Sequence, residues 1–418
     1  MNKRWYKLEN AAKIFPPSAN KKDTKVFRFY VELKEYVDPK ILNRALNETL
    51  KEFPLFRSTL KKGFFWYYLE KSNIKPIVEE ENIMPCDELK EGLLFKITYY
   101  KKRINIEINH ALTDGTGTLN FLQVLIKNYE IHKHNVSKEI VVDNISITDR
   151  EIDSYEKYYK KVKLIQKKED PFAYKIKGKN YPANALKIIE LVMPTKEVLK
   201  LSKEKGRTIT EYLTAILLKS VSETMSYKDK RKPVVIQVPV NLRNYFPSNT
   251  ARNFFNVINI SYKFDNEEDN FEAILESVSK QFKQKLTKEE LTKSMNTLAN
   301  FENIFLIRLI PIFIKDFVLK CIHHFLALYK TMSFSNVGVI KIPEELEKNI
   351  NMFGVFTSTD SISSCMCSYK DKLVITFTSH FIDHEIEKNF VRYLTNENIE
   401  ITVNTNIIGE DDVDEKVF

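Results

Sequence analysis

The chain has 418 residues, of which 43% are hydrophobic and 29% are charged, and its net charge is +9 at pH 7. This composition is typical of a globular protein, excludes extended disorder, and allows roughly two to three domains of about 150 residues. Because the positive charge comes from scattered lysines and no nucleic-acid-reading motif accompanies it, we expect no nucleic-acid partner. An attraction to anionic ligands or membrane surfaces stays open.

Three features that the sequence lacks suggest the cellular compartment of the protein. The stretch 1–15 has no apolar core and no cleavage site, and no run of about 18 apolar residues occurs. The four cysteines show no CxxC spacing. We therefore expect a cytoplasmic protein with reduced thiols and neither a signal peptide nor a transmembrane helix. Separately, we expect a monomer.

The first part of the chain is predicted to mix strands with helices. Asp38 followed by Pro39 is typical of a helix start, because the aspartate can cap the helix and proline fits its first position. Strands are predicted within 25–34, 55–70 and 93–110, and helices within 38–53 and 116–132.

After a charged, turn-rich stretch, 133–182, the second part of the chain again mixes strands with helices. A capping box from Thr208 to Glu211 starts one helix, and Gly206 ends the helix before it. Strands are predicted within 186–194, 232–243, 254–264, 331–343 and 372–381, and helices within 195–206, 208–221, 270–286 and 385–399. The sequence therefore predicts an α/β or α+β fold with two lobes.

One histidine stands out in the stretch 104–122. By the period of two in a strand, His110 shares a face with the isoleucines of 104–108, at the point where the strand ends. Partial desolvation there favours the neutral imidazole, which can accept a proton. Asp114 follows and could cap the next helix or pair with a buried cation, and Gly115 leaves room for a close backbone approach. A core histidine with an ordinary capping aspartate remains an alternative.

A lone arginine, Arg243, ends the apolar strand 232–243. If it is buried it needs a partner, and a guanidinium–carboxylate pair with Asp114 would fix the loop that carries His110. We expect this pair to be structural rather than directly catalytic. An exposed strand end is the alternative for Arg243.

Four segments resemble the CoA-dependent acyltransferase superfamily, and they come in its order. The stretch "NHALTDG", 109–115, is similar to the HxxxDG motif, and 238–257 is similar to the strand and turn whose arginine pairs with the motif aspartate. The stretches 334–343 and 26–60 resemble a later Ser/Thr-Asn strand and the opening strand and helix. The likeness is nearest to bacterial alcohol acetyltransferase-like proteins. Asn109 stands where condensation domains have a second histidine.

The resemblance implies two chloramphenicol acetyltransferase-like lobes, each a mixed sheet with flanking helices, and a tunnel between them. The lobes would span 1–165 and 183–418, joined by a crossover linker, 166–182. The implied activity is acyl transfer from acyl-CoA, as cosubstrate, to an apolar alcohol, with His110 as general base and Asp114 in the catalytic motif. Amide formation on an amine, or a non-catalytic protein that binds an acyl ligand or a partner, are the alternatives.

The same resemblance places Gly115 and Arg243 as structural residues of the site and makes Ser335 or Asn336 the candidate donor for the oxyanion. Either residue could instead cap or pair inside its strand. No permanent cofactor or metal is implied. His380 and His384 are four residues apart, but they follow a predicted strand rather than lying on a helix, so we expect no metal there.

The stretch 303–329 is very apolar yet interrupted by Arg308, Pro311 and Lys315. We predict a helix broken near Pro311, since proline removes a backbone donor. One interpretation is that the segment packs against the core or the tunnel, with Phe305, Leu309 and Phe313 lining the acceptor entrance. The other is an amphipathic element that admits lipid-like substrates or makes a peripheral membrane contact.

Overall fold

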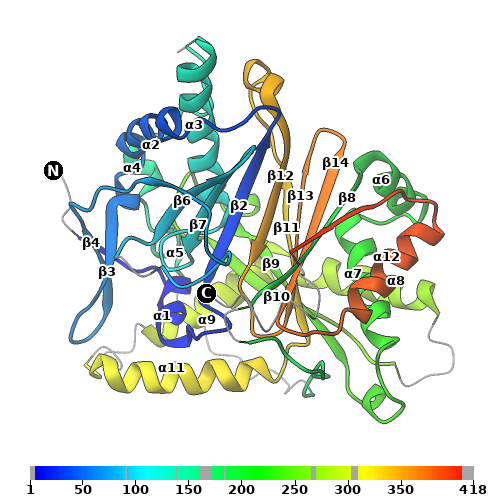
Figure 1. The fold of residues 1–418 in the computed structure, drawn as a ribbon. Coiled ribbons are helices and arrows are strands. Elements are labelled where there is room, and N and C mark those ends of the chain that lie inside the picture. The colour runs from blue at the N-terminus through cyan, green and yellow to red at the C-terminus, as the bar shows by residue number, and fades with distance from the viewer. Residues whose placement is uncertain are drawn as a thin grey trace.

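The computed structural model describes residues 5–89, 92–137, 139–160, 171–182, 185–264, 270–302 and 309–406. Figure 1 shows two sheet-rich lobes whose strands meet near the middle of the molecule, with helices on the outer sides. The predicted mixed α/β fold with two lobes is confirmed.

The first lobe contains a five-stranded sheet in the order β12-β2-β7-β6-β5. Helices α2 and α3 pack together and cover its outer side (Figure 1). A three-stranded sheet in the order β1-β4-β3 lies beside it. The elements are β1 (Trp5–Lys7), β2 (Val26–Leu33), α2 (Pro39–Glu52), β3 (Ser58–Lys62), β4 (Tyr67–Lys71), β5 (Val78–Glu80), β6 (Phe95–Tyr100), β7 (Arg103–Asn109), α3 (Gly115–His134) and β12 (Ile350–Thr357).

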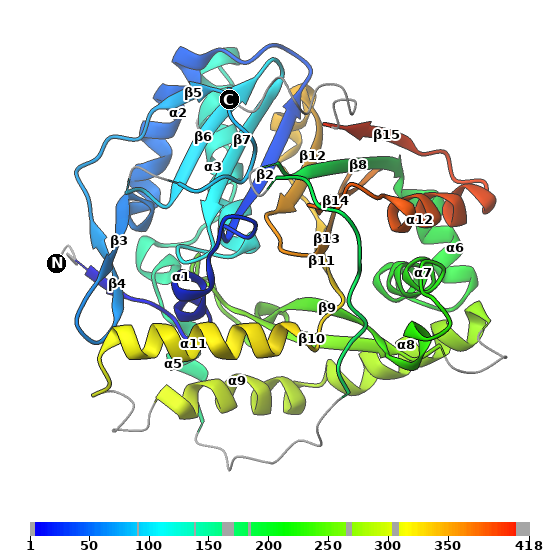
Figure 2. The same ribbon diagram turned by 60° about the horizontal axis from the view of Figure 1, so that its bottom comes forward.

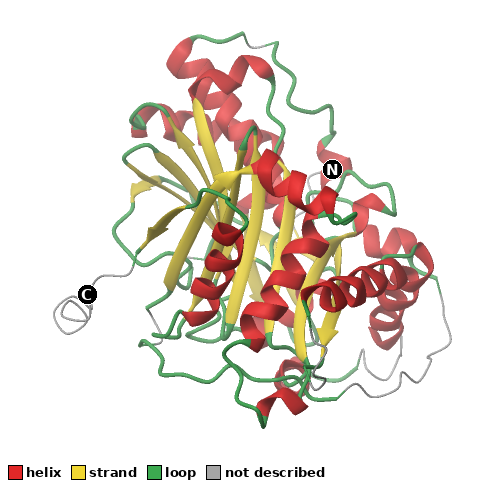
Figure 3. Ribbon diagram, turned by 90° about the vertical axis from the view of Figure 1, so that its right-hand side faces the viewer, coloured by secondary structure: helices red, strands yellow, loops and turns green. Residues whose placement is uncertain are grey.

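The second lobe contains a seven-stranded sheet in the order β10-β9-β11-β13-β14-β8-β15. Helices α7, α8 and α12 pack against one another over its outer face, which Figure 3 shows from that side. The elements are β8 (Lys187–Pro194), α6 (Thr195–Glu204), α7 (Ile209–Ser222), β9 (Val234–Asn241), β10 (Phe255–Tyr262), α8 (Phe271–Lys285), β11 (Met332–Val339), β13 (Ile362–Tyr369), β14 (Lys372–Ser379), α12 (Glu385–Asn396) and β15 (Thr402–Thr405).

The remaining helices connect or flank the lobes. Figure 2 shows α9 and α11 on the outside of the molecule, with α11 beside the short α1. Their bounds are α1 (Phe15–Ser18), α4 (Ile147–Arg150), α5 (Ser154–Tyr158), α9 (Lys288–Glu302) and α11 (Ile312–Ala327), with 3-10 turns η1 (Ala11–Ile14), η2 (Pro54–Arg57), η3 (Asp229–Arg231), η4 (Leu242–Asn244) and η5 (Glu344–Asn349). Within the described residues, none of these helices is long and apolar enough to span a bilayer.

The helix ends follow their local sequence. The Asp38 carboxylate accepts from the backbone N–H groups of Lys40 and Ile41 at 2.9 and 3.1 Å, and Pro39 opens α2. Thr208 and Glu211 form the predicted capping box of α7. Gly206 has a φ of +65°, which a residue with a side chain rarely adopts, and it follows the end of α6.

Strands β12 and β13 were not predicted. Every residue of β13 is buried, so its sequence shows no alternation of apolar and polar positions. Strand β12 belongs to the second half of the chain, yet it pairs antiparallel with β2, Phe353 opposite Val31. The first sheet therefore takes one strand from beyond the predicted linker, 166–182, of which 166–170 lie outside the described residues.

The interpretation of 303–329 as core is wrong for its described part. A helix does begin after Pro311, but Ile312 is the one buried residue among the 16 of α11. Leu309 and Phe313 are 53% and 64% exposed, so they lie on the outer surface and not in the core. That they border the acceptor entrance stays a prediction. Phe305 lies outside the described residues.

Candidate active site

His110 directly follows β7, the strand next to β2 in the first sheet. Its backbone N–H donates to the carbonyl of Lys25 at 2.8 Å, which fixes the turn out of the strand. The three isoleucines that share its strand face are fully buried. The position of His110 thus follows from the alternation of the strand, as predicted.

Aromatic rings surround the imidazole. Phe15 of α1 stacks on it with centroids 4.6 Å apart, Phe27 of β2 lies at 4.6 Å on a tilted plane, and Phe255 of β10 lies at 5.6 Å. Because these rings exclude water, burial lowers the pKa of His110 below its usual 6.5, and the negative charge of Asp114 opposes this shift. The imidazole is therefore neutral at neutral pH.

One amide side chain selects the tautomer of His110. Asn253 Nδ2 donates to the His110 carbonyl at 3.0 Å, and Asn253 Oδ1 lies 3.4 Å from the imidazole Nδ1. Since an amide oxygen can only accept, this arrangement favours a proton on Nδ1 and leaves Nε2 with a free lone pair. Asn253 is fully buried, and its Nδ2 also reaches Glu9 Oε2 at 3.5 Å. The sequence analysis did not identify Asn253. The one sequence signal for it is that a polar residue stands shortly before the apolar strand β10.

The Asp114 side chain joins three elements. Its Oδ1 accepts from the N–H of Gly117 at 3.0 Å and thereby caps α3. Its Oδ2 accepts from the N–H of Phe254 and from Arg243 Nη1, both at 2.8 Å. Only 4% of this side chain is exposed, and the pair with Arg243 is the ion pair that the sequence predicts. Asp114 thus connects the end of the histidine loop to the second lobe.

Arg243 holds the loop before β10 in addition to binding Asp114. Its Nη2 donates to the carbonyls of Thr250 at 2.9 Å and Arg252 at 2.7 Å, and its Nη1 donates to that of Phe254 at 3.3 Å. Asn253 lies within this loop. The guanidinium therefore fixes, through the backbone, the amide that contacts His110.

The close backbone approach expected at Gly115 occurs at Gly117 instead. A Cβ at Gly115 would lie 3.5 Å from the ring of Phe29, which is ordinary contact. A Cβ at Gly117 would overlap the carbonyl oxygen of Ala251 and the hydroxyl of Thr113. Gly115 opens α3, whereas Gly117 allows that helix to touch the loop held by Arg243.

Ser335 and Asn336 point to opposite faces of β11. Asn336 Nδ2 donates to the Thr210 hydroxyl at 2.8 Å, and its Oδ1 accepts from the Gly338 N–H at 2.8 Å. Its amide is thus engaged toward α7 in the second lobe. Ser335 is paired with Cys365, which packs in the core of the first lobe, so Ser335 lies on the face toward that lobe.

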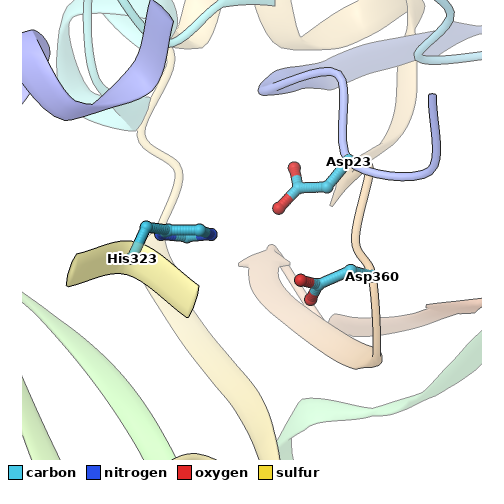
Figure 4. Close-up of side chains that lie close together, drawn as sticks. All are labelled: Asp23, His323 and Asp360. Atoms are coloured by element: carbon cyan, nitrogen blue, oxygen red, sulfur yellow. The ribbon is translucent and has the colours of Figure 1, made fainter. Parts of the chain in front are cut away.

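Figure 4 shows one polar cluster, Asp23, His323 and Asp360, whose side chains converge from three parts of the chain. The carboxylate and imidazole atoms lie within 4.8 Å of one another, a donor set that Zn²⁺ can use. Two lysines already neutralise it, since Lys25 Nζ lies 2.5 Å from Asp23 Oδ2 and Lys330 Nζ lies 3.7 Å from Asp360 Oδ1. We therefore interpret the cluster as an ion-pair network rather than a metal site.

The two histidines near the end of β14 lie in different surroundings. His380 is buried, and its Nδ1 and Nε2 lie 3.1 and 2.9 Å from the carbonyls of Ala185 and Lys22. His384 is exposed and precedes α12. His380 therefore links the second sheet to the segment before β2, and both of its nitrogens are engaged by backbone.

Comparisons with known proteins agree with this fold. Residues 69–314 match the model of a family described as "Transferase family". No curated protein matches the sequence significantly.

Solved structures give the same fold at low identity. TRI101 of Fusarium sporotrichioides, complexed with coenzyme A and T-2, is 10% identical with a TM-score of 0.65 over 96% of this chain and 99% of that chain. The first condensation domain of the calcium-dependent antibiotic synthetase is 13% identical, with a TM-score of 0.64 over 94% and 96%. Polyketide synthase associated protein 5 from Mycobacterium tuberculosis is 12% identical, with a TM-score of 0.60 over 93% and 96%.

The family model covers more than half of the chain, including the His110–Gly115 motif, Arg243 and the loop that the arginine holds. The chain therefore belongs to the Transferase family, within the CoA-dependent acyltransferase superfamily.

Proposed function

We propose that the chain is an acyl-CoA-dependent O-acyltransferase in which His110 is the general base and the acceptor is an apolar alcohol. The observation that carries this proposal is the His110 imidazole packed among aromatic rings with its Nδ1 beside Asn253 Oδ1, an arrangement that favours the neutral form. Such a histidine keeps Nε2 free to accept a proton, which is the requirement for a base. Its position in an HxxxDG match supports the same role.

In the proposed reaction, His110 Nε2 removes the proton of the acceptor hydroxyl as the oxygen attacks the thioester carbonyl of acyl-CoA. The tetrahedral intermediate collapses with cleavage of the carbon–sulfur bond, and the imidazolium returns its proton to the leaving thiolate. The products are an ester and free CoA. General-base help of this kind contributes about 10²–10⁴ in rate.

Two features support the substrate classes. The TRI101 structure contains coenzyme A, which supports acyl-CoA as the cosubstrate here. The rings of Phe15, Phe27 and Phe255 leave an apolar surrounding for the acceptor, which disfavours a sugar. We place both substrates in a tunnel between the two lobes of a monomeric, cytoplasmic enzyme.

We assign the oxyanion donor to Ser335 rather than Asn336. The Asn336 amide is engaged by Thr210 and Gly338, whereas Ser335 faces the first lobe, from which His110 comes. A preorganised hydrogen-bond donor aimed at the developing charge stabilises such an intermediate, and a serine hydroxyl can be that donor.

The test is a thiol-release assay with a panel of acyl-CoAs and alcohols, followed by product identification. His110→Ala should lower turnover at least about a hundredfold while the fold stays intact. The matched control is His384→Ala, since His384 is exposed and engaged in none of the contacts above. A folded His110→Ala protein with normal turnover would contradict the role of the base.

Amines belong in the same panel, because condensation domains share the fold. Product formation with amines alone would identify an amide-forming enzyme. Absence of turnover with every pair, together with binding of acyl-CoA, would identify a non-catalytic binding protein.

A further inference from the structure

Helix α11 has its apolar and polar sides reversed relative to a helix that packs on a core. The side chains that turn toward the protein include Lys315, Asp316 and His323, which are half-buried. The outward side is exposed and mainly apolar, with Lys320, Cys321 and His324 also exposed on the helix. We call it, with its neighbours, the apolar face: Phe64, Phe65, Phe172, Leu309, Phe313, Ile314, Phe317, Val318, Ile322, Phe325 and Leu326.

The exposed apolar side chains of the protein are concentrated on the apolar face rather than scattered over the surface. It holds 11 of the 23 exposed large apolar side chains among the described residues, and all six of the exposed phenylalanines there. Phe317 is 70% exposed and Phe64 is 69% exposed. Soluble monomers rarely expose a contiguous apolar patch of this kind unless it binds something.

The inward contacts of α11 are polar and specific, so the orientation of the helix is fixed. The Asp316 carboxylate accepts from Lys62 Nζ at 2.7 Å and from the Tyr67 hydroxyl at 2.8 Å. Lys315 Nζ lies 3.4 Å from the centroid of the Trp66 ring. These contacts come from the β3–β4 hairpin and prevent α11 from turning its apolar side inward.

The hairpin and a third segment extend the apolar face at both ends of the helix. The N–H of Ile312 donates to the carbonyl of Phe64 at 2.8 Å, which places the hairpin tip at the start of α11. At the other end, Phe172 contacts Phe325 edge-on with centroids 6.4 Å apart. Figure 2 shows α11 lying along the outside of the molecule, and its 16 residues span about 24 Å.

The charges around the apolar face are positive. Helix α11 and the two hairpin strands carry lysines 61, 62, 71, 315 and 320 against the acids Glu70 and Asp316. Asp316 is already paired with Lys62. A second copy of the chain would bring the same lysines to the contact and be repelled, whereas anionic headgroups would be attracted.

We propose that the apolar face docks on the surface of a bilayer that contains anionic lipid, with α11 lying in the plane of the interface and the phenylalanines entering the acyl boundary. The helix is amphipathic, basic at its edges and too short and interrupted to cross a membrane, as such elements are. Because α11 packs on α1, which carries Phe15 against His110, the docked molecule holds its candidate active site near the lipid.

The test is co-sedimentation of the full chain with large vesicles of phosphatidylcholine, alone or with about 30% phosphatidylserine. The wild type should bind the anionic vesicles more tightly, and added salt should weaken binding. The double variant Phe313→Ser/Phe317→Ser should bind at least about tenfold more weakly. The matched control is Tyr36→Ser/Tyr100→Ser, two exposed aromatic residues remote from α11.

Trp66 gives a second measurement beside the apolar face, since it follows Phe65 in the hairpin. The chain has two tryptophans, so Trp5→Phe leaves Trp66 as the sole reporter, and its emission should shift to shorter wavelength with anionic vesicles. Failure of the wild type to bind, equal binding by the phenylalanine variant, or equal binding to neutral vesicles would overturn the proposal. A dimer in sedimentation velocity that the double variant abolishes, without vesicle binding, would make the face a self-association surface instead. None of these readouts depends on catalysis.

Discussion

Asn253 contacts His110 twice, with its Nδ2 on the backbone carbonyl at 3.0 Å and its Oδ1 near the imidazole Nδ1 at 3.4 Å. One buried amide therefore holds the backbone of the histidine and favours a proton on its Nδ1. The amide is in turn held by the loop that Arg243 binds, so the proposed base depends on a chain of contacts that begins at the Asp114–Arg243 pair.

The first prediction concerns pH. A general base works in its neutral form, so activity should rise with pH through the pKa of His110. Because burial lowers that pKa, the acid limb of the kcat/KM profile should lie below 6.5. In Asn253→Asp, a carboxylate beside Nδ1 would stabilise the imidazolium and move the acid limb to higher pH.

A pH–rate series with wild type, Asn253→Asp and Asn47→Asp checks this. Asn47 is exposed on α2, so its variant adds the same charge without touching the site. An acid limb that is the same in all three proteins would contradict the role of Asn253 as a positioning residue.

The second prediction concerns the Asp114–Arg243 pair. Asp114→Asn leaves the Arg243 guanidinium buried without its counter-charge, which costs about 3–5 kcal/mol of the free energy of unfolding. The loop at 250–254 should loosen, so activity should fall together with stability. Urea unfolding of Asp114→Asn and of Glu204→Gln, which alters an exposed pair with Lys200, provides the comparison. Equal midpoints for the two variants would show that the buried pair is dispensable.

The third prediction separates the two glycines of the motif region. Gly117→Ala should destabilise the fold by about 1–3 kcal/mol, since its Cβ would overlap the Ala251 carbonyl. Gly115→Ala should be close to neutral, because its Cβ meets the Phe29 ring at 3.5 Å and alanine favours a helix. Thermal unfolding of both variants decides between them, and the reverse order would contradict the placement of α3 against the loop.

The fourth prediction concerns β11. Ser335→Ala should reduce kcat by about 10²–10³ with little change in stability, if its hydroxyl is the oxyanion donor. Asn336→Ala should instead lose about 1–3 kcal/mol of stability, because it leaves the Thr210 hydroxyl without its partner. Kinetics and urea unfolding on the same preparations distinguish the two. A catalytic loss confined to Asn336→Ala would reverse the assignment.

Some features of the fold could be predicted because they depend on neighbours in the sequence. The cap at Asp38 and the capping box at Thr208 need only residues two or three positions away. The alternation of β7 placed His110 correctly, and the Arg243 partner followed from the cost of burying a lone charge.

Other features depend on residues that are distant in the sequence. Strand β13 is buried on both faces, so it lacks the alternating pattern that reveals a half-exposed strand. Asn253 and Phe15 contact His110 from positions 143 and 95 residues away in the sequence, and no local sequence pattern indicates such contacts. The apolar side of α11 faces outward because Asp316 and Lys315 contact side chains of the β3–β4 hairpin. The helix sequence alone does not show these partners.

The pairing of β12 with β2 also determines when the first lobe can be completed during synthesis. A ribosome that has made residues 5–160 has released β2 with one edge paired to β7 and the other edge unsatisfied until Ile350–Thr357 emerge. Open strand edges template pairing between chains, so the nascent protein is exposed to misassociation through nearly two hundred further residues. Expression of the first half alone should yield aggregates, and addition of the second half in the same cell should rescue its solubility.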